Sequence, residues 1–168
     1  MAEGSPEIDA LRGGDGSLDG SALRSILPYG EHFLFVDHVS VLTADAVEAR
    51  FRIPEDSAYL RSHFVDLPLM PGVLIAEGLA QAASLIVRYR LEAPERHHVL
   101  GLEVERARFP APARPGDALE YRGRLGAMNR RVARLEGEAY VEGTVVCRAK
   151  ITVAIVDRDA LRQRLTKT

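Results

Sequence analysis

The sequence predicts an α+β domain in which an antiparallel sheet wraps around one long, buried helix. From Pro71-Gly72 to about Leu91 the chain is apolar on nearly every side, which is typical of a helix covered by its neighbours. Later segments alternate apolar and polar residues with the period of two that half-buried strands require. A buried helix followed by a run of such strands indicates this fold class.

Ahead of the long helix we expect a short helix, two strands and an irregular link. Residues 21–27 can form the short helix, and Pro28 prevents its extension. A strand follows at about residues 33–41. Residues 47–53 give the clearest strand in the first half, because Val, Ala, Phe and Ile alternate there with Glu and Arg. Residues 54–70 form the link.

Beyond the helix the chain is expected to form a run of strands. They cover residues 99–108, 118–126, 131–142 and 144–156. Glu142-Gly143 predicts a tight turn between the last two. Small residues in the helix, Gly78 and Ala82 among them, allow the strands to pack closely around it.

Length and composition predict one folded domain. A chain of 168 residues is long enough for one core and too short for two full domains, and 46% hydrophobic with 27% charged residues is ordinary for a globular protein. Residues 1–20 are rich in Gly, Asp, Glu and Ser without an apolar period, so they are expected to be a disordered tail. The domain then covers residues 21–168.

Several functional classes are disfavoured by the sequence. No signal peptide opens the chain and no charge-free apolar run is long enough for a membrane span, so we expect a cytoplasmic protein. Cys147 is the only cysteine, which excludes an internal disulfide and a CxxC-type zinc site. The net charge of −2 gives no general reason to expect a nucleic-acid partner.

Glu77 is unusual because it lies among apolar residues of the long helix. A carboxyl in such a place tends to have a raised pKa and can donate a proton near neutral pH. The alternative is structural, since Glu77, Gln81, Ser84 and Arg88 share one helix face that can simply be its wet side. His63 lies just before the helix, and histidine is a residue type suited to act as a base near neutral pH. The free N–H groups of the helix start can hold a thioester oxygen.

The stretch from Ser62 to Gln81 (SHFVDLPLMPGVLIAEGLAQ) resembles the signature of the (3R)-3-hydroxyacyl-acyl-carrier-protein dehydratases, which have the hot-dog fold. Shorter pieces agree in order along residues 21–156. These pieces are Leu27-Pro28, residues 33–37, Ala107-Arg108-Phe109, Pro115-Gly116-Asp117 and residues 145–147.

The resemblance implies a homodimer whose sheets join edge to edge, with each active site at the interface. It implies that His63 takes the proton next to the carbonyl and that Glu77, from the other subunit, protonates the departing hydroxyl. Glutamate at position 77 resembles the branch that only dehydrates. Acyl carrier protein is the implied partner, and no metal or redox cofactor is implied. The expected oxyanion and substrate-binding residues are Gly72, Val73, Phe64 and Gln81.

The histidine loop departs from the family pattern. Gly-His-Phe-Pro-Gly is usual, whereas this chain has Ser62, Val65 and Asp66 around His63-Phe64. Loss of two glycines and a proline predicts a reshaped loop. A contact from Asp66 would raise the pKa of His63 and weaken it as a base.

Other activities stay open on sequence alone. The main prediction is dehydration to a trans-2-enoyl thioester in fatty-acid or polyketide and polyene biosynthesis. The alternatives are a hot-dog acyl thioesterase and a non-catalytic subunit that binds carrier or completes a partner's site. A surface for an acidic carrier is expected at six arginines, with an arginine-rich solvated sheet face as the alternative. They are Arg106, Arg108, Arg114, Arg130, Arg131 and Arg134.

Overall fold

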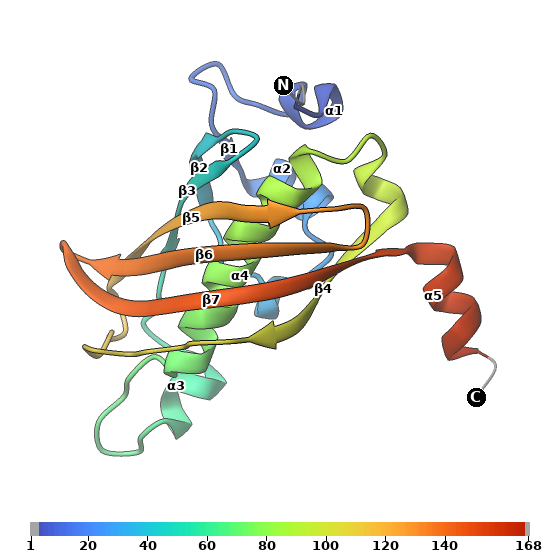
Figure 1. Ribbon diagram of the computed structural model, residues 1–168. Coiled ribbons are helices and arrows are strands. Elements are labelled where there is room, and N and C mark those ends of the chain that lie inside the picture. Colours follow the sequence, from blue (N-terminus) through green and yellow to red (C-terminus); the bar gives the residue numbers. More distant parts are fainter. Residues whose placement is uncertain (1–3, 167–168) are drawn as a thin grey trace.

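A computed structural model describes residues 4–166, and their seven strands form one antiparallel sheet in the order β1-β2-β3-β5-β6-β7-β4 (Figure 1). The strands are β1 (Leu18–Asp19), β2 (His38–Leu42), β3 (Ala46–Arg52), β4 (His97–Val104), β5 (Ala118–Met128), β6 (Val132–Val141) and β7 (Thr144–Asp157). The helices are α1 (Pro6–Asp9), α2 (Gly20–Ile26), α3 (Ala58–Ser62), α4 (Gly72–Tyr89) and α5 (Arg158–Leu165), with single 3-10 turns η1 (Glu31–Phe33) and η2 (Pro94–Arg96).

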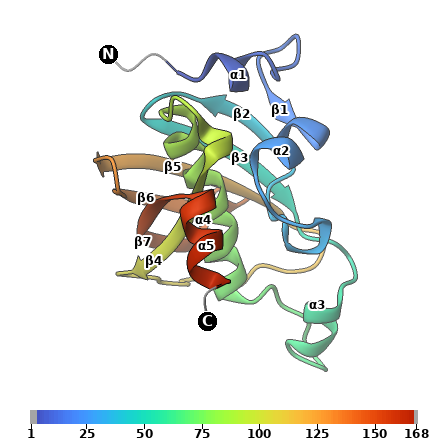
Figure 2. The same ribbon diagram turned by 90° about the vertical axis from the view of Figure 1, so that its right-hand side faces the viewer.

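The sheet curves around α4, as the sequence predicts (Figure 2). Small residues bring the two layers close together. A Cβ placed on Gly78 would lie 2.2 Å from the hydroxyl of Tyr121, and one on Gly123 would lie 2.9 Å from Val47 and 3.3 Å from Ala83. Such distances leave no room for larger side chains, so glycine sets the depth at which the helix sits in the sheet.

By length and composition alone, α4 could cross a membrane, but 67% of its apolar window is buried inside the molecule. It is therefore the core helix of this fold. Its buried face includes Ile75, Leu79, Leu85 and Ile86, which contribute to a single hydrophobic cluster with the sheet.

The predicted turn between β6 and β7 is confirmed. Glu142 and Gly143 have φ of 47° and 78°, the left-handed values that a two-residue hairpin loop requires. Val141 pairs with Thr144 directly across this turn. The register then places the alternating apolar residues of both strands toward α4.

The strand expected at residues 33–41 is shorter than predicted and begins only at His38. The amide of Gln81 explains the difference, because it accepts from the Phe35 N–H and donates to the Phe33 carbonyl, both at 2.9 Å. Those two backbone groups are thus satisfied by α4 rather than by a neighbouring strand. The link before α4 also contains α3, which was not predicted.

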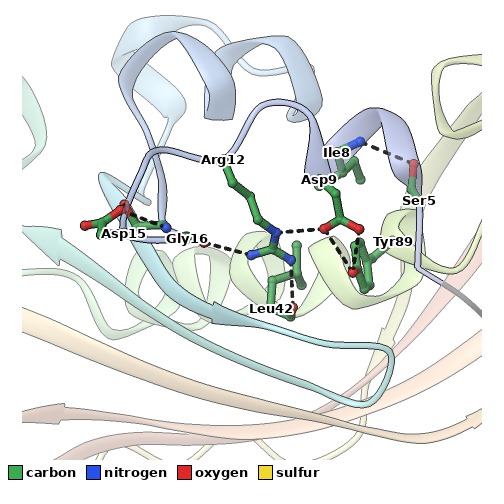
Figure 3. Close-up of polar contacts among 9 residues, drawn as sticks. Ser5, Ile8, Asp9, Arg12, Asp15, Gly16, Leu42 and Tyr89 are labelled. Carbon is green, nitrogen blue, oxygen red and sulfur yellow. Dashed lines mark hydrogen bonds and ion pairs between the residues drawn. The ribbon is translucent and has the colours of Figure 1, made fainter.

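The expectation of a disordered tail is wrong for residues 4–20. Ile8 of α1 is buried, and Leu18 of β1 is buried and pairs with Val39. Figure 3 shows how the segment is held: the Tyr89 hydroxyl donates to Asp9 at 3.0 Å, Arg12 pairs with Asp9 at 2.7 Å, and Arg12 donates to the Leu42 carbonyl at 2.9 Å. Residues 1–3, like 167–168, lie outside the described part.

Candidate active site

His63 stands at the end of α3, where the loop back to the core fixes its imidazole. The Ser57 side chain caps the start of α3 by accepting from the Leu60 N–H at 3.3 Å. His63 Nδ1 lies 3.2 Å from the Leu69 carbonyl oxygen, and the Leu69 N–H donates to the His63 carbonyl at 2.8 Å. A carbonyl only accepts, so Nδ1 carries the proton in this contact, and in the neutral imidazole Nε2 is then the nitrogen with the free lone pair.

The loop after His63 closes without the glycine and proline that are usual in the family. The Leu67 N–H donates to the Phe64 carbonyl at 3.3 Å, which makes a tight turn, and the Phe64 N–H donates to the Leu67 carbonyl at 3.0 Å. Phe64 stacks on the imidazole with ring centroids 4.1 Å apart and is half exposed, while Val65 is 88% exposed. In the part of the chain that the structure describes, Asp66 forms no hydrogen bond or ion pair with His63, so the contact considered from the sequence does not form.

The N-terminus of α4 is open toward the same region. Its first backbone acceptor, the Pro71 carbonyl, is taken by the N–H groups of Leu74 and Ile75 at 2.9 and 3.2 Å. The N–H groups of Gly72 and Val73 come before the first of these donors, so they have no acceptor within the helix and lie at the positive end of its dipole. This is the arrangement expected for holding a carbonyl oxygen.

A cavity of about 240 Å³ brings His63 and Gly72 together. Leu69, Met70 and Ile75 form part of its apolar wall, and the segment 109–113 closes the other side. Phe109 was not predicted as a site residue, although Ala107-Arg108-Phe109 was part of the resemblance. A Cβ on Gly72 would lie 2.7 Å from the Phe109 ring, so only glycine lets this ring approach the helix start.

Glu77 does not line this cavity within the same chain. Its side chain is half-buried on α4, and its Oε1 accepts from Gln81 Nε2 at 3.0 Å. Gln81 is fully buried, and its amide oxygen and nitrogen are both used by residues 33–35 and Glu77. Gln81 therefore orients Glu77 instead of facing a ligand, which differs from the role expected for it.

The six arginines expected to attract a carrier do not gather in one place. Only Arg106 and Arg108 line a groove of about 520 Å³ on the face of the sheet turned away from α4. Arg114 and Arg134 each line a different hollow, while Arg130 and Arg131 lie in the connection from β5 to β6. Further cations in the groove are Arg122, Arg124, Arg148 and Lys150.

Solved structures with a related shape confirm the hot-dog arrangement. The dehydratase heterocomplex ApeI:P from Xenorhabdus doucetiae matches with a TM-score of 0.70 at 17% identity, over 85% of this chain and 96% of that one. A thioesterase from Haemophilus influenzae matches with a TM-score of 0.55 at 18% identity, over 80% of this chain and 82% of that one. At these identities the likeness concerns the fold alone.

Sequence relatives are more specific. Residues 27–150 match the FabA-like domain. The FabZ 3-hydroxyacyl-acyl-carrier-protein dehydratase of Oleidesulfovibrio alaskensis is 36% identical over 144 residues, covering 84% of this chain and 94% of the relative. That of Thermotoga neapolitana is 37% identical over 133 residues, covering 79% and 94%. The chain therefore belongs to the FabZ-type 3-hydroxyacyl-acyl-carrier-protein dehydratase family.

Proposed function

We propose that the protein is a hydro-lyase that converts a 3-hydroxyacyl thioester on acyl carrier protein into the trans-2-enoyl thioester. The observation that carries this proposal is the family membership, which spans most of the chain and includes the stretch holding His63 and Glu77. Fatty-acid biosynthesis is the setting we infer from these relatives. The single cysteine fits a reducing compartment such as the cytoplasm.

His63 and Glu77 divide the proton transfers between them. Nε2 of His63 removes a proton from the carbon next to the thioester carbonyl, while the N–H groups of Gly72 and Val73 hold the carbonyl oxygen as negative charge develops there. The electron pair forms the double bond as the C3–O bond breaks. Glu77 gives its proton to the departing hydroxyl, and the products are the enoyl thioester and water. Phe64 packs on His63 and helps to hold the imidazole plane.

Two copies of the chain are needed to complete each site in this proposal. Glu77 is absent from the His63 cavity of its own chain, which fits a histidine and a glutamate supplied by different subunits. Strand β4 lies at the edge of the sheet and exposes apolar side chains that an isolated edge strand would be expected to avoid. These side chains are Leu100, Leu102 and Val104. Pairing of two β4 edges would cover them.

The carrier protein is expected to dock at the groove that contains Arg106 and Arg108. The two carboxylates that line this groove already have partners, because Glu136 pairs with Lys150 at 3.5 Å and Glu138 binds Arg148 and Tyr140. The groove therefore keeps a positive excess, which favours an acidic partner. Phe109, directly after Arg108, lines the His63 cavity, so the groove and the site share one segment.

Turnover of 3-hydroxyacyl thioesters on acyl carrier protein tests the proposal. His63→Ala and Glu77→Gln should each lower the rate of enoyl formation about 10²–10⁴-fold, since loss of a general acid or base has that effect. His32→Ala, which removes an imidazole outside the cavity, is the matched control and should retain the wild-type rate. Full activity of both site variants would refute the assigned roles.

The same assay separates the other candidates. A thioesterase would release free thiol without an enoyl product. A non-catalytic subunit would be inactive alone and become active on addition of a partner chain. The non-catalytic candidate is tested because the loop at Val65 is exposed and differs from the family pattern.

A further inference from the structure

Arg88 is a buried cation with no acidic partner among residues 4–166. It lies in the last turn of α4 and is 5% exposed. Its one hydrogen bond goes to the Pro94 carbonyl at the long distance of 3.5 Å, and its Nε has no partner within residues 4–166. Arg88 also forms no ion pair in that range. Burying a charge in this way is strongly unfavourable unless a counter-ion replaces the lost water.

Arg88 borders a cavity of about 150 Å³ that is lined by a second arginine, two histidines and, at its rim, two glutamates. Arg158, His97 and His98 line the same cavity. Burial, and then the charges of Arg158 and Arg88, lower the pKa of His98. The geometry therefore places a buried guanidinium, a second arginine and two imidazoles, all of which can donate hydrogen bonds, around one small space.

The two carboxylates on the rim do not neutralise Arg88. Glu7 and Glu95 line the cavity, but both residues are exposed, and neither pairs with Arg88 or Arg158 in the described part of the chain. Arg158 instead donates to the backbone carbonyl of Glu95 at 2.9 Å. The buried guanidinium is left to be compensated from the cavity itself.

The N-terminal segment closes one side of this cavity. Glu7, Ile8 and Leu11 form its wall, and Asp9 is tied to Tyr89, the residue after Arg88 (Figure 3). This segment precedes residues 27–150, which match the family. The wall therefore comes from outside the region that matches the family.

We propose that the cavity binds a small oxyanion, with a carboxylate as the best-fitting chemistry, through the terminal nitrogens of Arg88. A guanidinium offers parallel donors that match two carboxylate oxygens. Two sources can supply this group. One is a free anion, and the other is the far end of an acyl chain, since Glu77 and Arg88 share a helix face about 16 Å apart. The second source rests on the proposed dehydratase function.

Thermal unfolding of the full chain with succinate, acetate or inorganic phosphate, against chloride at equal ionic strength, tests the site. At several times the dissociation constant, the best of these anions should raise the melting temperature of the wild type by about 2–4 °C. Arg88→Met should abolish the rise while keeping a folded protein, because an apolar side chain of similar length replaces a buried charge. Arg164→Met, at an exposed arginine of α5 outside the cavity, should keep the full rise.

No rise for the wild type, or an equal rise for wild type and Arg88→Met, would overturn the proposal. If circular dichroism shows that Arg88→Met does not fold, Arg88→Lys replaces it in the test. Arg88→Lys keeps the charge and should bind the anion at least tenfold more weakly than the wild type. Binding by Arg88→Lys at wild-type strength would overturn the two-nitrogen contact.

Turnover then distinguishes the two sources. If the anion is the substrate's own end, Arg88→Met should raise KM at least tenfold for a 3-hydroxyacyl chain ending in a carboxylate and leave a methyl-ended chain unchanged. If only free anions bind, neither KM changes and the site stands as a free-anion site. If the wild type binds the anion but turns over neither substrate, the result counts against the dehydratase function and not against this cavity.

Discussion

At the scale of single residues, a close contact between α4 and the sheet depends on a missing side chain. Gly78 follows Glu77 and leaves just enough room for the Tyr121 ring. The Tyr121 hydroxyl is fully buried and has no hydrogen-bond partner among the residues described, and burial raises its pKa well above the ordinary value. Shape, and not hydrogen bonding, is what this tyrosine contributes to the position of Glu77.

Exchanges at this contact should therefore have opposite effects on stability. Gly78→Ala should lower the free energy of unfolding by about 1–3 kcal/mol, because its Cβ overlaps the Tyr121 hydroxyl. Tyr121→Phe should leave stability unchanged or raise it by up to about 1 kcal/mol, since it removes an unpaired buried hydroxyl. The double variant should recover part of the loss. Urea unfolding at one fixed protein concentration measures all three, and a large loss in Tyr121→Phe alone would contradict this reading.

The sequence offers candidates for the chemical residues of the site but not for the residues that support them. His63, Glu77 and the helix start can be proposed from the sequence because they fall in one continuous stretch, and their catalytic roles stay predictions. The contribution of Gln81 could not, because its partners at residues 33–35 lie 46 and 48 positions away in the chain. Arg88 was taken only as part of a polar helix face, since the lack of an acidic partner is a property of the folded chain.

At the scale of elements, the sequence predicts the strongly periodic helices and strands well and the short or polar helices poorly. The long helix, the last three strands and the turn at Glu142 follow directly from pattern. By contrast, α1 buries only Ile8, too little for a pattern to emerge. Helix α5 was missed because it is polar, and Asp157 caps it by accepting from the N–H groups of Asp159 and Ala160.

The exposed edge of β4 gives a prediction at this scale. Leu102→Glu should convert a dimer into monomers and remove dehydratase activity, because a charge on an edge strand opposes pairing and the proposed sites need two chains. Light scattering during size-exclusion chromatography would follow the mass. Leu165→Glu, at an equally exposed leucine of α5, is the control and should leave both mass and turnover unchanged. A dimer that survives Leu102→Glu would mean that the subunits join elsewhere.

At the scale of the whole molecule, charge is distributed unevenly although the chain is nearly neutral. Cations concentrate on the outer face of the sheet, opposite the side that covers α4. In that groove Arg106, Arg108 and Arg124 form no ion pair with any described residue. Unpaired surface charges contribute little to stability and are free to attract an oppositely charged protein.

Charge reversal in this groove should separate carrier docking from chemistry. Arg106→Glu with Arg108→Glu should lower kcat/KM at least tenfold for the carrier-bound substrate at low salt, because steering between opposite charges is lost. The same substrate on a small neutral thiol should react at the wild-type rate. Added salt should slow the wild type toward the variant, since it screens the attraction. Arg130→Glu with Arg131→Glu is the matched control outside the groove, and a larger loss there would move the docking surface to the β5–β6 connection.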